Sequence, residues 1–388
     1  MIQYSVYENF ELWERDKMFC KKTMKKISAA ALSAVLGMSL SFSAVSMPEA
    51  SAIGLGDVVG IGIGAAQAAQ QKEQIMKEYR YLNTDEEGRE MLFQKFQNDY
   101  GVNDDYELCQ RFDTIMANLS AAVAEVDPSI NERPYKYFIS QDNSINAACG
   151  MGHVMMVNTG TFRYMNDDEL AAIVGHEMGH GQKDHMIKSL SSNMDKTLLA
   201  SIAVAATGGT ALANVLGSLT LNQSIVHADK RKEWEADGLA FEYIVHTNYN
   251  PGACAAVMQK FIDLMGPQKQ NFGEMLLNPS DHPNSEARRD KYAEKLSEYS
   301  GKHVTAKNGK VMVNGKDFVA PAPAGGMSAM ERSYFVFGNL AAAYNHGQNK
   351  GDAHVENGTV MLGLQPILTP VEGDESAEVL AERLNSIK

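Results

Sequence analysis

The sequence predicts a mainly α-helical protein that contains a small β-sheet and ends in an α+β module. Several stretches before residue 300 place apolar residues three and four positions apart, as on one face of a helix. Two short runs, 135–140 and 154–157, are rich in branched and aromatic residues and are typical of strands. Beyond residue 301, Asn-Gly pairs at 308–309, 314–315 and 357–358 indicate hairpin turns between short strands.

The N-terminal 52 residues have the pattern of an export signal. Residues 1–17 are polar and acidic, so Met18 or Met24 would be a better start. Four lysines then precede an apolar run over 27–46, and Ala50-Ser51-Ala52 fits an A-x-A cleavage pattern. We therefore expect residues 1–52 to contain a signal peptide with an over-extended N-terminus. Cleavage would leave a periplasmic or extracellular protein; an uncleaved anchor is the alternative.

Charge and cysteine content exclude several classes of partner and site. The 388 residues carry a net charge of −13, which argues against a nucleic-acid partner, because such proteins present a basic face. The four cysteines contain no CxxC pair, so neither a thiolate zinc site nor a disulfide scaffold is expected. The composition otherwise fits a globular protein with ample core.

Helices are expected over 65–79, 86–100 and from Asn103, whose following segment places Leu108, Phe112, Ile115, Met116 and Leu119 on one face. The stretch 198–221 contains no charged residue and is long enough to cross a bilayer. Its glycines and polar residues favour a buried helical hairpin or a lid, with contact to a membrane surface left open. We expect one domain over 53–300 and an accessory α+β domain over 301–388.

The most informative stretch is the segment that begins at Asn166 and contains His176-Glu177-x-x-His180. Residues four apart share one face of a helix, so the two imidazoles can bind the same metal ion. Glu177 lies close to that ion and can take a proton from a bound water. Asn166 with Glu169 three residues later forms the pattern of a capping box. A buried helix with two structural histidines is the alternative.

A second acidic stretch can complete the metal site. Glu233 and Asp237 lie four apart, on one helical face. Zinc held by two imidazoles requires a third ligand, which Glu233 can supply. Asp237 can accept the other N–H of a ligating histidine and fix its ring. Glu235 is a competing ligand, but it points away from the face that Glu233 and Asp237 share.

Two further segments are candidates for substrate contact. The strand before the metal helix could be an edge strand that accepts a peptide as an added strand, with an internal strand as the alternative. Its candidate substrate-binding residues are Val154, Met155, Met156, Val157 and Asn158. His282 lies in a Pro-bounded loop with Arg288 six residues later, and both could reach the site and stabilise a developing oxyanion.

These motifs, in this order, resemble the HtpX/BepA-like and CAAX-prenyl-endopeptidase family of zinc metallopeptidases over residues 70–295. His185, five residues after His180, and Val157-Asn-Thr-Gly160 are also similar to that family. The resemblance implies a gluzincin fold with one zinc ion per chain. It implies His176, His180 and Glu233 as ligands, Glu177 as general base, Asp237 behind a ligand, and His282 and Arg288 near the oxyanion or gating the metal.

The expected function is therefore that of an exported zinc endopeptidase. Its partners would be polypeptides, in particular misfolded or envelope proteins. The alternative is a non-hydrolytic envelope chaperone or assembly factor that contains zinc and binds unfolded clients. An intact base at Glu177 argues against that alternative, because a binding protein needs no base. The sequence leaves open the oligomeric state, the natural substrate and the partner of residues 301–388.

Overall fold

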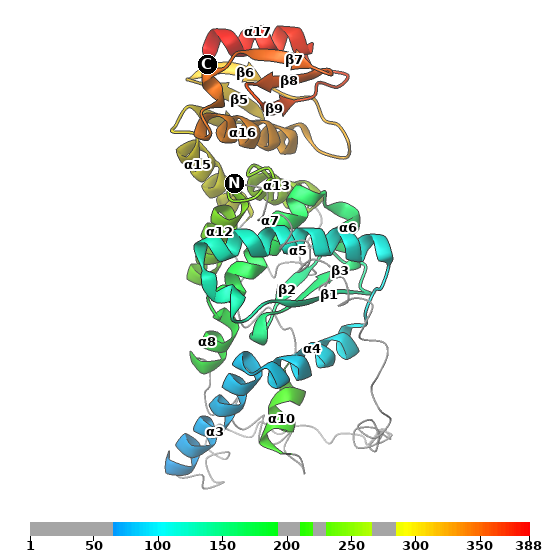
Figure 1. Cartoon of the computed structure of the whole chain (residues 1–388), viewed down its shortest axis with the longest axis vertical. Helices are drawn as coiled ribbons and strands as arrows, with labels where there is room; N and C mark the ends of the chain where they lie inside the picture. Colours follow the sequence, from blue (N-terminus) through cyan, green and yellow to red (C-terminus); the bar gives the residue numbers. More distant parts are fainter. Residues whose placement is uncertain (1–64, 193–209, 220–229, 266–284) are drawn as a thin grey trace, which may run out of the picture. The chain divides into compact units, whose positions relative to one another are not determined.

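The computed structural model describes residues 65–192, 210–219, 230–265 and 285–388, and the fold is mainly α-helical with small β-sheets (Figure 1). The described residues from 71 to 388 belong to one compact unit. The predicted signal sequence, His282 and most of the stretch 198–221 lie outside the described residues. Within the described residues, no helix combines the length and the apolar character needed to cross a membrane.

Within the described residues, three α-helices precede the first sheet, close to the positions that the sequence predicts. They are α3 (Ala65–Thr84), α4 (Glu86–Tyr100) and α5 (Tyr106–Val126). Helix α5 begins where the Asp105 side chain accepts a hydrogen bond from the backbone N–H of Leu108. Its predicted apolar face is buried at Phe112, Ile115, Met116 and Leu119 and packs into the main hydrophobic core.

The first sheet has three strands in the order β1-β3-β2, namely β1 (Lys136–Ser140), β2 (Ala147–Cys149) and β3 (Val154–Asn158). Strand β3 pairs with β1 in parallel and with β2 in antiparallel orientation. The prediction that Val154 to Asn158 form an edge strand is therefore wrong. All five residues are buried, and such a continuous apolar run is typical of a strand covered on both sides. Strand β2 was not predicted, because its residues Ala147, Ala148 and Cys149 are small and are not typical of strands.

Helices form most of the remaining body. They are α6 (Thr159–Tyr164), α7 (Asp167–Gln182), α8 (His185–Ser192), α10 (Ala211–Ser218), α12 (Lys230–Ile244), α13 (Ala253–Met265) and α15 (Ser285–Tyr299), with short 3-10 turns at Pro128–Asn131, Met151–His153 and Gln348–Lys350. Helix α7 packs against α5, α12, α13 and β2. At Gly179 a Cβ atom would lie only 3.0 Å from the Cα of Ala236, so glycine permits the close approach of α7 and α12.

The C-terminal module consists of two copies of one unit, each with three antiparallel strands followed by a helix. The first copy contains β4 (Val304–Lys307), β5 (Lys310–Val313), β6 (Lys316–Val319) and α16 (Ala329–Asn345). The second contains β7 (Ala353–Glu356), β8 (Thr359–Leu362), β9 (Gln365–Leu368) and α17 (Ala377–Ile387). The pairing shifts at Val311/Met312 in the first copy and at the corresponding Val360/Met361 in the second.

The two copies interlock. Helix α16 packs on β4 and β5 of its own copy and on β9 of the other, while α17 packs on β7, β8 and β6. Two hydrogen bonds repeat this exchange: Asn339 Nδ2 donates to Ile367 O (3.0 Å), and Arg383 NH1 donates to Phe318 O (2.7 Å). Helix α16 also packs against α13 and α15. The domain boundary at residue 300 stays a prediction.

Candidate metal centre

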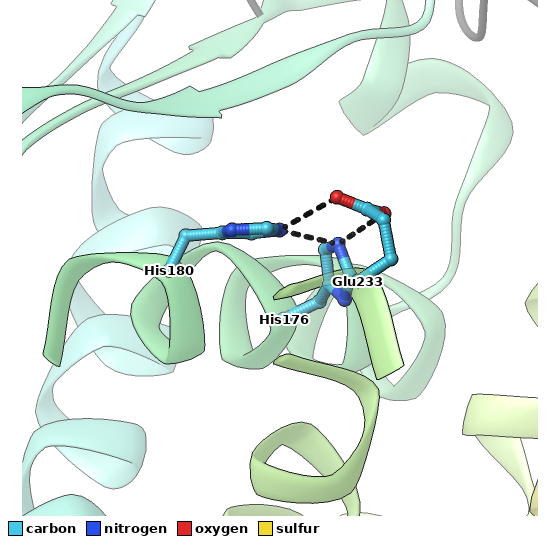
Figure 2. A group of neighbouring side chains, drawn as sticks. All are labelled: His176, His180 and Glu233. Carbon is cyan, nitrogen blue, oxygen red and sulfur yellow. Dashed lines mark hydrogen bonds and ion pairs between the residues drawn. The ribbon is translucent and has the colours of Figure 1, made fainter. Parts of the chain in front are cut away.

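Helix α7 supplies three of the predicted site residues. It begins with the predicted capping box: Asn166 Oδ1 accepts the backbone N–H of Glu169 (2.9 Å), and Glu169 Oε2 accepts that of Asn166 (3.0 Å). Leu170, Val174 and Met178 are fully buried in the core. The cap and the buried apolar face together fix the start of the helix and its rotation. His176 and His180 therefore project from the same face, as Figure 2 shows.

Helix α12 brings the predicted carboxylate to these rings. His180 Nε2 lies 3.1 Å from His176 Nε2 and 3.2 Å from Glu233 Oε1, and His176 Nε2 lies 3.6 Å from Glu233 Oε2 (Figure 2). All three side chains are buried. Among the residues that the structure describes, this is the one group of three or more His, Cys, Asp or Glu side chains with metal-binding geometry.

The chemistry of this donor set fits a cation. His176 Nδ1 lies 2.9 Å from Asp237 Oδ1 and carries the proton of that hydrogen bond, so the neutral ring presents the lone pair of Nε2 to the site. Two imidazole lone pairs and a buried carboxylate would then face one another, which is unfavourable unless a metal ion or a bound proton lies among them. Without a metal ion, burial and Arg288 oppose a charge on His176, yet Asp237 and Glu233 raise its pKa to about 9.

A buried ion pair supports His176 from behind. Asp237 accepts hydrogen bonds from Arg288 Nε (2.8 Å), Arg288 NH2 (2.5 Å) and Tyr292 OH (2.8 Å). Burial raises the pKa of Asp237, but Arg288 and His176 outweigh it and hold that pKa well below its usual range. The ring of His176 is therefore fixed by an ionised carboxylate that is itself held by two side chains from α15.

A different arrangement supports His180. Its Nδ1 lies 2.8 Å from His185 Nδ1, and His185 Nε2 lies 3.1 Å from Glu235 Oε2. If His180 binds metal through Nε2, its Nδ1 donates, so His185 must accept at Nδ1 and donate from Nε2 to Glu235. Burial lowers the pKa of His185 although Glu235 opposes the shift, and a neutral ring suits this role. The side chain of Glu235 is 50% exposed.

Glu177 lies between the ligand set and the sheet. Its Oε2 accepts the backbone N–H of Cys149 in β2 (3.0 Å). Burial, and to a smaller extent Glu233, raises the pKa of Glu177 to about 7, while His176 and the Cys149 N–H lower it. Within the described residues, no strand pairs with the other edge of β2. The candidate base is thus held at the unpaired edge of β2.

The remaining predicted residues lie in different surroundings. Arg288 is buried on the Nδ1 side of His176 and hydrogen-bonded to Asp237, and its role near an oxyanion or in gating the metal stays a prediction. The residues Val154 to Asn158 are internal, as described above. Glu235 contacts His185 and is no part of the ligand set. Sequence reasoning missed Tyr292 and the contact between the Cys149 backbone N–H and Glu177. Tyr292 lies four residues after Arg288, on the same helical face, which was the available signal.

Comparison with known proteins agrees with this geometry. The profile of Peptidase family M48 matches residues 110–296. Metalloprotease LoiP of Escherichia coli (strain K12) is 27% identical over 178 residues, which cover 44% of this chain and 66% of LoiP. Metalloprotease YcaL from the same organism is 24% identical over 177 residues, covering 45% and 66% of the two chains. The beta-barrel assembly-enhancing protease of that organism is 24% identical over 139 residues, covering 34% and 28%.

This chain thus spans 66% of the length of LoiP and of YcaL, and 28% of the beta-barrel assembly-enhancing protease. The matched segment contains both ligand helices and Arg288, and it ends before the C-terminal module. Residues 110–296 therefore form a domain that belongs to peptidase family M48.

Proposed function

We propose that this protein is a zinc-dependent endopeptidase. The convergence of His176, His180 and Glu233 next to the buried carboxyl of Glu177 is the observation that supports it. The set of two imidazoles and one carboxylate matches catalytic zinc sites, which keep a fourth position open for water. A purely structural site would have four protein ligands, and the described residues supply three.

Zinc bound by these three ligands would polarise the scissile carbonyl and bring the pKa of water close to neutral. Glu177 takes a proton from the attacking water and passes it to the leaving amine. Burial raises the pKa of Glu177 and a bound cation would lower it again, so the carboxylate is available to accept a proton at neutral pH. Asp237 and His185 keep the two imidazoles in the tautomer that presents Nε2 to the site.

The substrate lies along β2 rather than β3. Strand β2 packs against α7, and its Cys149 N–H already reaches the base. An extended peptide that pairs with this edge would bring a backbone carbonyl over the ligand set, and main-chain pairing tolerates many sequences. The proposed substrates are therefore polypeptides in extended or unfolded form.

We place the enzyme in the cell envelope of its source. The export pattern of residues 1–52 supports this location, and so does one relative's name, which refers to enhanced β-barrel assembly. Misfolded or envelope proteins are then the proposed natural substrates. Contact between a membrane surface and the stretch 198–221 is part of the same hypothesis.

The test compares the purified wild-type chain with Glu177→Gln and His180→Ala. We measure bound zinc and the cleavage of an unfolded protein such as casein. Glu177→Gln should keep zinc and lose activity about 10²- to 10⁴-fold, because it removes the base alone. His180→Ala should lose both. Glu242→Gln, an exposed residue on the same helix as Glu233, is the matched control and should behave as wild type.

Cleavage of casein by Glu177→Gln at the wild-type rate would refute the assignment of Glu177 as the base. If wild type and Glu177→Gln both bind stoichiometric zinc and neither cleaves casein, the non-hydrolytic envelope factor is favoured. In that case, binding of unfolded clients by wild type and Glu177→Gln alike would distinguish it from an inactive preparation.

A further inference from the structure

A second buried acidic cluster lies at the opposite end of the catalytic helix α7 from His180. It joins three elements: Glu169 in the first turn of α7, Lys260 of α13 and Glu331 in the first turn of α16. The side chains of Glu169 and Glu331 are 0% and 2% exposed. The C-terminal module therefore contributes a buried charged group next to the start of the helix that carries the candidate metal ligands.

One lysine cannot neutralise both carboxylates. Lys260 Nζ lies 2.6 Å from Glu169 Oε2 and 3.2 Å from Glu331 Oε1, and it also donates to Tyr164 O (3.1 Å). If both glutamates were ionised, the buried cluster would carry a net charge of −1, which is costly away from water. Two adjacent carboxyl groups commonly avoid this cost by sharing one proton.

The hydrogen bonds of the cluster point to the same conclusion. Glu169 Oε1 is buried and has no hydrogen-bond partner, and Glu331 Oε1 has none besides its 3.2 Å ion-pair contact with Lys260. A proton on one of the two groups would supply the missing donor. Glu169 Oε2 already accepts two hydrogen bonds, from the Asn166 N–H and from the Lys260 ammonium. Glu331 is thus the better site for the proton.

We propose that Glu331 carries a proton at neutral pH and shares it with Glu169, so that the C-terminal module holds the start of α7 through a pH-sensitive carboxyl pair. Glu331 is then a positioning residue that acts through Glu169, about two helical turns before His176. Burial, followed by the hydrogen bond and charge of Glu169, raises the pKa of Glu331 to about 8, and Lys260 opposes this shift.

Further hydrogen bonds join the elements around the cluster. Asp263 of α13 accepts hydrogen bonds from Ser328 Oγ (2.6 Å) and Gln259 Nε2 (2.8 Å). Asn250, which precedes α13, donates through Nδ2 to Phe335 O of α16 (3.0 Å) and through its backbone N–H to Asp168 Oδ1 of α7 (2.9 Å). The start of α7 and the helix α16 are thus joined at two adjacent points.

The test is the dependence of thermal unfolding on pH for wild type and Glu331→Gln. A raised carboxyl pKa means that the folded state binds the proton more tightly than the unfolded state. Wild type should therefore lose stability as pH rises from about 4.5 to about 8, and no further from this group above that range. The amide introduced by Glu331→Gln mimics the protonated acid at every pH, so this loss should disappear in the variant.

The unfolding midpoint of Glu331→Gln should match that of wild type near pH 5 and exceed it by at least about 2–4 °C at pH 9. Glu378→Gln is the matched control, because Glu378 occupies the first turn of α17 in the second copy and is exposed. Its difference from wild type should not change with pH. Parallel curves for wild type and Glu331→Gln would overturn the proposal.

An infrared difference spectrum between wild type and Glu331→Gln provides a direct second measurement. It should contain the C=O stretch of a protonated carboxylic acid at pH 7, and this band should disappear by about pH 9. Absence of the band at pH 7 would contradict the shared proton even if Glu331→Gln folded poorly. Neither measurement uses peptidase activity, so the outcome is independent of the proposed function.

Discussion

The two histidines of the candidate metal centre are supported in opposite ways. Behind His176 lies Asp237, whose side chain is 4% exposed and held by Arg288 and Tyr292. Behind His180 lies a neutral ring, His185, which ends at a half-exposed carboxylate, Glu235. The first support is a charge buried among protein groups, and the second is a relay that reaches the surface. The same task, fixing a ring tautomer, should therefore depend on very different amounts of free energy.

The largest effect is expected from Asp237→Ala. Removal of this carboxylate leaves the buried guanidinium of Arg288 uncompensated, which costs about 3–5 kcal/mol of stability, and releases the ring of His176. We expect a clear drop in the unfolding midpoint together with at least a 10- to 100-fold loss of zinc affinity. Calorimetry and competition with a zinc chelator measure the two effects.

Asp290→Ala is the control for this change, because Asp290 lies on the same helix as Arg288 with a side chain that is 64% exposed. It should leave both quantities unchanged. A stable Asp237→Ala protein with wild-type zinc affinity would show that the buried pair contributes nothing to His176.

An intermediate effect is expected from His185→Phe. The phenyl ring keeps much of the packing in a position that is 2% exposed but cannot accept the proton of His180 Nδ1. Zinc affinity should fall about 10-fold, at the lower end of the usual range for such partners. His185→Gln retains an acceptor for His180 and a donor for Glu235 and should recover most of the affinity. Equal losses in both variants would indicate that packing, not the hydrogen bond, explains the effect.

The smallest effect is expected from Glu235→Gln. His185 is neutral, and the glutamine of Glu235→Gln can still accept its Nε2–H. The change therefore removes only the interaction of one exposed charge with the metal site, so zinc affinity should change by less than about fivefold. Because the interaction is screened by salt, the difference from wild type should shrink further between low and high ionic strength. A loss as large as that of Asp237→Ala would mean that the surface carboxylate is as important as the buried one, and the comparison would fail.

Local pattern predicted the parts of the site that lie on one helix. The capping box at Asn166, the shared face of His176 and His180, and the preference for Glu233 over Glu235 all follow from helical geometry, and the structure has each of them in place. Prediction failed where pairing partners lie far apart in sequence. The run Val154 to Asn158 looks alike at the edge and in the centre of a sheet until its neighbours are known.

Sequence by itself determined the helices, the ligand spacing, the hairpin turns and the fold class, because these depend on residues within a few positions of one another. Only the tertiary structure decided that β2 forms the edge near Glu177, that Arg288 lies behind His176, and that Glu331 of the C-terminal module meets Glu169. These contacts join segments far apart along the chain, and burial then sets the protonation of the groups that meet. The sequence pattern alone does not identify which distant segments will be in contact, or which polar groups will be buried together.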